Sequence, residues 1–283
     1  MRSRIAGCIL AGLLSVMPAY GQETPRVLFF SKSSGFEHPV ISYKKAQPSH
    51  AEHVLQKLAD ENGVELTATK DGSLINAENL ANFNLVIFYT TGNLFEGGTD
   101  GQPPLPADGL DALIAWVENG GGFMGFHSAA DTFGKHDPEQ EGKFIKLLGG
   151  EFGGHGAQFE GKLVVVDADH SVAANIPEGH ADHDEWYTFI NLNEGEMHVV
   201  ALMDPGAERG KQEMYDRPNY PVIWTMGKGA GRVYYNAMGH REDVWDDATF
   251  QQMVVDAAGW ALGEGELDSE PNFKEVVPEQ PKE

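Results

Sequence analysis

The first half of this chain alternates short apolar runs with longer segments of helical periodicity, and this pattern constrains its fold more than any other feature. The short runs, typical of buried strands, are residues 26–31, 64–69, 84–90 and 123–126. Residues 48–62 and 110–117 place apolar side chains three and four positions apart, which is typical of amphipathic helices. The alternation predicts an α/β fold: a doubly wound, mostly parallel sheet with helices on both faces.

The second half of the chain is richer in strand signals. Extra strands are expected at residues 162–166, 186–190, 198–203, 221–226 and 232–236, followed by a closing helix at 244–262. No linker-like stretch divides the chain, so residues 22–263 are predicted to form one domain. Residues 264–283 are rich in Glu and Pro, which predicts a disordered, acidic tail.

The N-terminal segment is typical of a secretory signal peptide. Arg2 and Arg4 precede an apolar stretch at residues 5–16, and small residues at Ala19 and Gly21 suit cleavage before residue 22. Residues 1–21 are therefore predicted to direct export to the periplasm or the medium, with no membrane attachment after cleavage. The alternative is an N-terminal anchor helix.

Composition excludes several classes of function. The net charge of −23 argues against a nucleic-acid partner, because phosphate contacts need clustered Lys and Arg. The one cysteine, Cys8, lies in the predicted signal peptide, so thiol catalysis and Cys-rich metal sites are excluded for the mature chain. No Walker motif and no dinucleotide-binding glycine pattern follows the first strand, so no nucleotide cofactor is expected.

Four histidines occupy loops or strand ends of the predicted sheet: His38, His127, His155 and His240. In a parallel sheet such positions meet at one edge, where ligands bind. Imidazoles delivered by separate loops suit a divalent metal such as zinc, and the same set suits metal-free acid–base chemistry. A structural role, with each ring bonded to a backbone carbonyl, is the competing interpretation. Surface or packing roles are expected for His50, His53, His136, His170, His180 and His198.

Several motifs, taken in order, resemble the ThuA-like (trehalose utilisation) domain family over residues 26–263. They are Gly35-Phe-Glu-His38, Gly120-Gly-Gly-Phe-Met-Gly-Phe-His127, Leu147-Leu-Gly-Gly-Glu-Phe-Gly-Gly-His155, Asp184-Glu-Trp-Tyr187, Pro221-Val-Ile-Trp224 and Gly229-Ala-Gly-Arg-Val-Tyr-Tyr-Asn-Ala-Met-Gly-His240. The resemblance implies a class I glutamine amidotransferase-like, flavodoxin-like fold. That superfamily's amidotransferases use a Cys after the Gly-rich strand. Phe126 and His127 stand at that place here, so amidotransferase activity is not expected.

The resemblance also implies a role in the use of disaccharides and glycosides, in company with oxidoreductases that make 3-keto sugars. The expected function is an enzyme, a hydrolase or a lyase or isomerase, acting on a glycoside or its 3-keto derivative. The expected catalytic residues are His127, Glu185 and His240, with Glu185 as a candidate general base or metal ligand. The expected sugar-binding residues are His38, Trp186, Tyr187 and Arg241. The alternative is a non-catalytic carbohydrate-binding or accessory protein, and a homo-oligomer is compatible with either.

Overall fold

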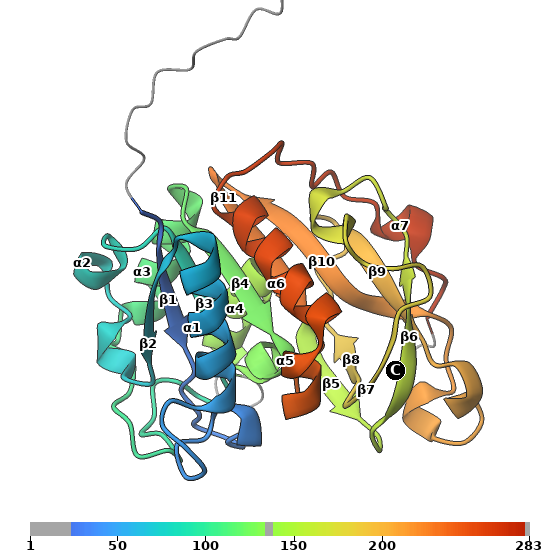
Figure 1. Ribbon diagram of the computed structural model, residues 1–283, viewed down its shortest axis with the longest axis horizontal. Coiled ribbons are helices and arrows are strands. Elements are labelled where there is room, and N and C mark those ends of the chain that lie inside the picture. The colour runs from blue at the N-terminus through green and yellow to red at the C-terminus, as the bar shows by residue number, and fades with distance from the viewer. Residues whose placement is uncertain (1–23, 134–137, 281–283) are drawn as a thin grey trace, which may run out of the picture.

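The computed structural model describes residues 24–133 and 138–280, and its centre is a nine-stranded sheet (Figure 1). The strands are β1 (Arg26–Phe30), β2 (Glu65–Thr69), β3 (Leu85–Phe88), β4 (Gly122–Phe126), β5 (Glu151–His155), β6 (Phe159–Val165), β7 (Ala181–Asp184), β8 (Tyr187–Ile190), β9 (His198–Asp204), β10 (Tyr220–Lys228) and β11 (Gly231–Asn236). The order in the large sheet is β2-β1-β3-β4-β11-β10-β9-β6-β7, and β5 pairs with β8 in a separate two-stranded sheet. The predicted signal peptide at residues 1–21 lies outside the described residues.

The predicted α/β architecture is confirmed. Strands β2, β1, β3, β4 and β11 pair in parallel, and the strands beyond β11 pair antiparallel. The helices are α1 (His50–Asn62), α2 (Ala77–Leu80), α3 (Gly109–Glu118), α4 (Pro138–Leu148), α5 (Glu242–Asp246), α6 (Ala248–Ala261) and α7 (Phe273–Val276). In Figure 1, α1, α5 and α6 lie in front of the sheet, and α3 and α4 lie behind it. Among the described residues, no helix is both long and apolar enough to cross a membrane.

The sequence explains how the first crossover helix begins and ends. Ser49 caps α1 and forms a capping box with Glu52: each side chain bonds to the other residue's backbone N–H. Gly63 ends the helix in the left-handed region at φ 67, which costs glycine little. Buried apolar residues of α1 face the sheet. Helix α1 begins at His50, two residues after the start of the predicted segment 48–62.

The second half differs from the prediction in detail. Strands β5 and β7 and helix α4 were not expected, and the closing helix is divided into α5 and α6. The division lies at Asp247, whose carboxylate accepts the N–H groups of Thr249 and Phe250 and so caps α6. β5 has glycines at two of its five positions, which hides the usual strand signal.

The prediction of a disordered tail is wrong for residues 264–280. Phe273 on α7 is buried, and the Asn272 side chain bonds to both the N–H and the carbonyl of Val199 in β9. The Glu270 carbonyl lies 2.7 Å from Nδ1 of His198. A few apolar and amide side chains thus attach a segment whose overall composition is acidic. Residues 281–283 lie outside the described part.

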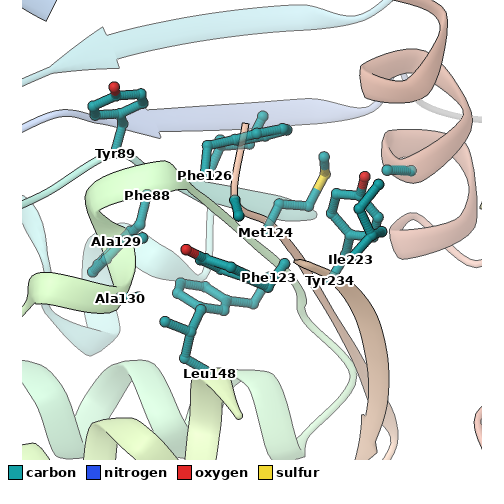
Figure 2. Close-up of a cluster of buried hydrophobic side chains, with 14 of the residues drawn as sticks. Phe88, Tyr89, Phe123, Met124, Phe126, Ala129, Ala130, Leu148, Ile223 and Tyr234 are labelled. Atoms are coloured by element: carbon teal, nitrogen blue, oxygen red, sulfur yellow. The ribbon is translucent and has the colours of Figure 1, made fainter. Parts of the chain in front are cut away.

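Side chains of β3 and β4 belong to a cluster of buried apolar residues (Figure 2). Phe88 and Phe123 lie fully buried with ring centroids 5.0 Å apart, and Phe126 packs 5.8 Å from Trp245. Figure 2 shows Phe88, Phe123 and Phe126 within one cluster of buried side chains. The residue that follows β4, His127, therefore starts from a rigid support.

Candidate functional site

Three imidazole rings meet at the carboxyl edge of the parallel strands. His38 ends the loop after β1, His127 directly follows β4, and His240 lies shortly after β11. Their ring centroids are 5.0 Å apart for His38 and His127, and 5.2 Å apart for the other two pairs. The parallel pairing places these strand ends at one edge, so the rings form a nearly equilateral triangle.

Glu185 brings a carboxylate into this triangle from the link between β7 and β8. Its Oε2 lies 3.1 Å from Nδ1 of His240 and 3.5 Å from Nε2 of His127. Its Oε1 lies 3.3 Å from Nδ1 of His155, the last residue of β5. One carboxylate therefore contacts three imidazoles, and Oε1 contacts the most exposed of them, since the His155 side chain is 40% exposed.

Backbone contacts fix the tautomer of His127. Its Nδ1 lies 2.8 Å from the Ala237 carbonyl, and a carbonyl only accepts, so Nδ1 donates the proton. In the neutral ring the lone pair is then on Nε2, which faces Glu185 and His240. His127 has φ 41, an unusual value for a non-glycine residue, and the Tyr235 hydroxyl holds its carbonyl at 2.7 Å.

Burial sets the charge states within the cluster. Burial lowers the pKa of His127, and it lowers the pKa of His38 well below the ordinary value, helped by the neighbouring His127 and His240. For Glu185, burial opposes ionisation, but its interactions with His127 and His240 lower its pKa overall. The site at neutral pH therefore combines neutral His38 and His127 with an ionised Glu185. These are the protonation states that a metal ligand or a general base requires.

Asp184 is a site residue that sequence reasoning missed. Its buried carboxylate accepts the N–H of Glu185 at 2.9 Å and the N–H of Gly239 at 2.7 Å. It thereby ties the turn that carries His240 to the end of β7, next to Glu185. The Gly239 carbonyl is held in turn by the Tyr89 hydroxyl at 3.0 Å. Asp184 is part of the Asp184-Glu-Trp-Tyr187 motif, but the sequence does not show that its side chain points toward Gly239.

Tyr187 completes the buried side of the cluster. Its hydroxyl lies 3.4 Å from Nε2 of His38, and its ring centroid lies 4.0 Å from that of His127. Burial raises the pKa of this phenol well above 10, so the hydroxyl stays protonated. The Nδ1 of His38 is buried and has no partner among the described residues. The cluster thus contains a polar atom that a bound ligand could satisfy.

Other predicted site residues lie differently. Trp186 is fully buried, and its Nε1 donates to the Phe159 carbonyl at 3.2 Å, so it offers no exposed face on which a sugar could stack. Neighbours in an extended segment point to opposite sides, and Trp186 therefore turns away from the side shared by Glu185 and Tyr187. Arg241 is partly exposed and binds Asp243 at 2.8 and 2.6 Å.

The candidate ligand set also changes by one member. Four residues can each place one ligand atom within 4.8 Å of the others: His38, His127, Glu185 and His240. His155 is outside this set, and its Nδ1 also lies 2.9 Å from the Gly156 carbonyl. The structure therefore replaces the predicted four histidines by three histidines and a carboxylate.

Histidines away from the cluster have local partners. His198 lies 3.0 Å from Asp167, His50 lies 3.0 Å from Asp246, and Nδ1 of His170 accepts the Val172 N–H. His180, expected to lack convergent neighbours, has its Nε2 2.5 Å from the carboxylate of Asp182. The effect of the His180–Asp182 pair on stability can be measured separately from the candidate site.

The His180–Asp182 pair is expected to make stability depend on pH. The hydrogen bond with Asp182 raises the pKa of His180 in the folded state above its unfolded value of about 6.5. The pair's contribution is therefore fully present below that unfolded pKa and is lost as the pH rises through the folded pKa. Urea unfolding of Asp182→Asn should show a larger loss of stability at pH 6 than at pH 9. In a His180→Gln background this pH dependence should vanish, and its persistence would contradict the assignment.

Comparisons with known proteins identify one family and several solved structures with a similar fold. A family model described as ThuA, trehalose utilisation, matches residues 26–261. No curated protein matches. A ThuA-like protein from Bacteroides uniformis ATCC 8492 is 24% identical with a TM-score of 0.67, and the alignment covers 91% of this chain and 99% of that one.

More distant structures share the fold. A ThuA-like protein from Parabacteroides merdae ATCC 43184 is 16% identical with a TM-score of 0.65, over 85% of this chain and 91% of that one. A β-galactosidase from Rahnella sp. R3 is 11% identical with a TM-score of 0.51, over 84% of this chain but only 31% of that enzyme. At these identities the structural likeness establishes the fold alone.

Proposed function

Because the chain belongs to the ThuA family, whose model spans residues 26–261, we propose that it is an enzyme that acts on a glycoside or disaccharide, or on its 3-keto derivative. The description of the family, trehalose utilisation, implies a carbohydrate-related function. The observation that carries the enzymatic proposal is the contact of the Glu185 carboxylate with three imidazoles. An ionised carboxylate in contact with imidazoles is suited to proton transfer.

The chemistry follows from the position of each group. A ketone acidifies the C–H bond next to it, and Oε1 of Glu185, on the more exposed side, is placed to take that proton. The electron pair of this bond forms a C=C bond and expels the glycosidic oxygen from the next carbon. His240, which must be in its imidazolium form for this step, then gives the leaving oxygen a proton, while the Tyr187 hydroxyl, which stays protonated, donates a hydrogen bond to the ketone oxygen. The products are an alcohol and an unsaturated keto sugar, so the step is an elimination with no external reagent.

We further propose that the cluster binds a divalent metal such as zinc, for which a specific observation speaks. With Zn–N bonds of about 2.0–2.1 Å and tetrahedral angles, imidazole ring centres lie about 5 Å apart. The three ring spacings here are 5.0, 5.2 and 5.2 Å. A bound ion would polarise the ketone oxygen. His127 and His240 would then be ligands, and Glu185 Oε1 would carry the proton from carbon to leaving oxygen.

The proposed setting is outside the cytoplasm, on the strength of the predicted signal peptide at residues 1–21. The mature chain would then meet glycosides before or after their oxidation. Neither a nucleotide cofactor nor a nucleic acid enters this proposal.

An activity screen of residues 22–283 tests the proposed function. The purified protein is incubated with glycosides and with their 3-keto forms, with and without a chelator, and products are followed by chromatography. Product from a keto glycoside supports the elimination, and its loss on chelation with return on adding zinc supports the metal. Calorimetric binding of intact sugars without product on prolonged incubation would instead favour a non-catalytic carbohydrate-binding protein.

The metal content of the protein is expected to depend on the candidate ligand set of His38, His127, Glu185 and His240. The mature protein, purified without a His tag, should contain about one equivalent of zinc or another first-row divalent ion by elemental analysis. His127→Ala and His240→Ala each remove an imidazole from the triangle and should lose most of it. His155→Ala is the matched control and should keep its metal, because His155 lies outside the set of four. Full metal content in the His127 and His240 variants would contradict the proposed site.

A further inference from the structure

Phe36 is the most exposed large apolar side chain in the described part of the chain, with 63% of its surface exposed. Leu267, at 42%, is the other one. A single exposed apolar residue is common and by itself needs no explanation. Phe36 differs because its backbone is fixed and because its ring adjoins the candidate site.

Three hydrogen bonds hold the backbone around Phe36. The Ser34 N–H donates to the Thr91 carbonyl at 2.8 Å, and the Thr91 hydroxyl donates to the Phe36 carbonyl at 2.8 Å. The Thr99 hydroxyl donates to the Gly35 carbonyl at 2.7 Å. The exposed ring therefore projects from an anchored segment, and little backbone entropy remains to be lost when a ligand contacts it.

The ring of Phe36 borders the imidazole triangle. Its centroid is 4.9 Å from that of His38, and the two rings are nearly perpendicular. His38 is in turn 5.0 Å from His127 and 5.2 Å from His240. Phe36 is thus at most two ring spacings from the groups assigned to the chemistry, a span that one disaccharide can bridge.

We propose that Phe36 is the aromatic platform of a sugar-binding subsite that holds the non-reacting ring of a disaccharide. The proposal rests on the proposed function, because it assumes a carbohydrate ligand. A pyranose ring presents an apolar face of C–H groups and a polar rim, so it can cover the exposed ring while its hydroxyls stay in water. Because the ring of Phe36 contacts His38, whereas the Glu185 carboxylate contacts His127, His155 and His240, the sugar over Phe36 would be the one that does not react. The proposal places the aromatic sugar contact at Phe36, whereas the sequence predicted it at Trp186.

Calorimetry with trehalose and glucose as probes tests the subsite on residues 22–283. The wild-type protein should bind trehalose about tenfold more tightly than glucose, since only the disaccharide has a second ring for Phe36. Phe36→Ala should abolish that preference and leave glucose binding unchanged, whereas Phe36→Trp should retain it. Leu267→Ala is the matched control, an exposed apolar side chain truncated elsewhere, and should behave as wild type. In turnover of a keto disaccharide, Phe36→Ala should raise KM about tenfold at constant kcat.

Three results would overturn the platform: an unchanged preference for trehalose in Phe36→Ala, an equal loss for both sugars in that variant, or no binding of either sugar to the wild type. The last result would also remove the carbohydrate ligand from the proposed function. Failure of the catalytic proposal alone has a different signature. The Phe36-dependent preference for trehalose would then be measured normally, while no product formed from any keto glycoside.

Discussion

Glutamine in place of Glu185 is expected to lower turnover of a keto disaccharide by about 10²–10⁴-fold, the usual contribution of a positioned general base. The amide keeps the shape of the side chain and can still hydrogen-bond to His240 and His127, but it cannot accept a proton from carbon. Because both the metal-free and the metal-assisted versions of the reaction assign that proton to Oε1, the loss is expected with or without a bound ion. The measurement is kcat and KM for the wild type and Glu185→Gln under saturating zinc.

Asp182→Asn is the control for this experiment. It also neutralises a carboxylate that faces an imidazole, but its pair with His180 lies apart from the cluster. Turnover by Asp182→Asn should equal that of the wild type, and circular dichroism should show both variants folded. A folded Glu185→Gln protein with wild-type kcat would remove Glu185 from the chemistry, whatever the histidines do.

The parallel half of the fold is predictable because its signals are local. A strand such as β3, buried on both faces, is a continuous apolar run, and α1 carries its own cap at Ser49 and its own stop at Gly63. The antiparallel half depends on long-range pairing instead. β7 contains Ala181 to Asp184 and no large apolar residue, and it becomes a strand through its pairing with β6.

The same distinction explains the candidate site. The positions of His38, His127 and His240 follow from one rule, that parallel strands deliver their carboxyl ends to a shared edge. Glu185 reaches the cluster from the antiparallel half, whose topology the periodicity did not reveal. The sequence made Glu185 a candidate base or ligand, but it could not show that Glu185 joins the three imidazoles in the candidate ligand set while His155 lies outside it. Phe36 escaped notice because an exposed aromatic residue has no sequence signal that separates it from a buried one.

Trp186→Ala is expected to lower the free energy of unfolding by about 3–5 kcal/mol, the range for removing a large aromatic side chain from a core. The indole is fully buried against Gly161, where even a Cβ atom would approach it to 2.4 Å. Its Nε1 donates to the Phe159 carbonyl, and its own carbonyl accepts the Tyr215 hydroxyl at 2.7 Å. Urea unfolding measures the loss. Gly161→Ala should be destabilising for the complementary reason, since the added methyl group has no room.

Trp186→Phe separates a core role from a sugar-binding role. Phenylalanine keeps most of the buried apolar surface and loses the hydrogen bond to Phe159, which costs about 1 kcal/mol. The folded variant should therefore keep the wild-type affinity for trehalose, because Trp186 is buried on the side away from the cluster. The structure and the sequence-based expectation disagree on this one measurement. If a folded Trp186→Phe protein binds trehalose about tenfold more weakly than the wild type, Trp186 belongs to the sugar site. If Trp186→Phe binds trehalose as the wild type does, and Phe36→Ala loses the preference for trehalose over glucose, the aromatic contact is at Phe36.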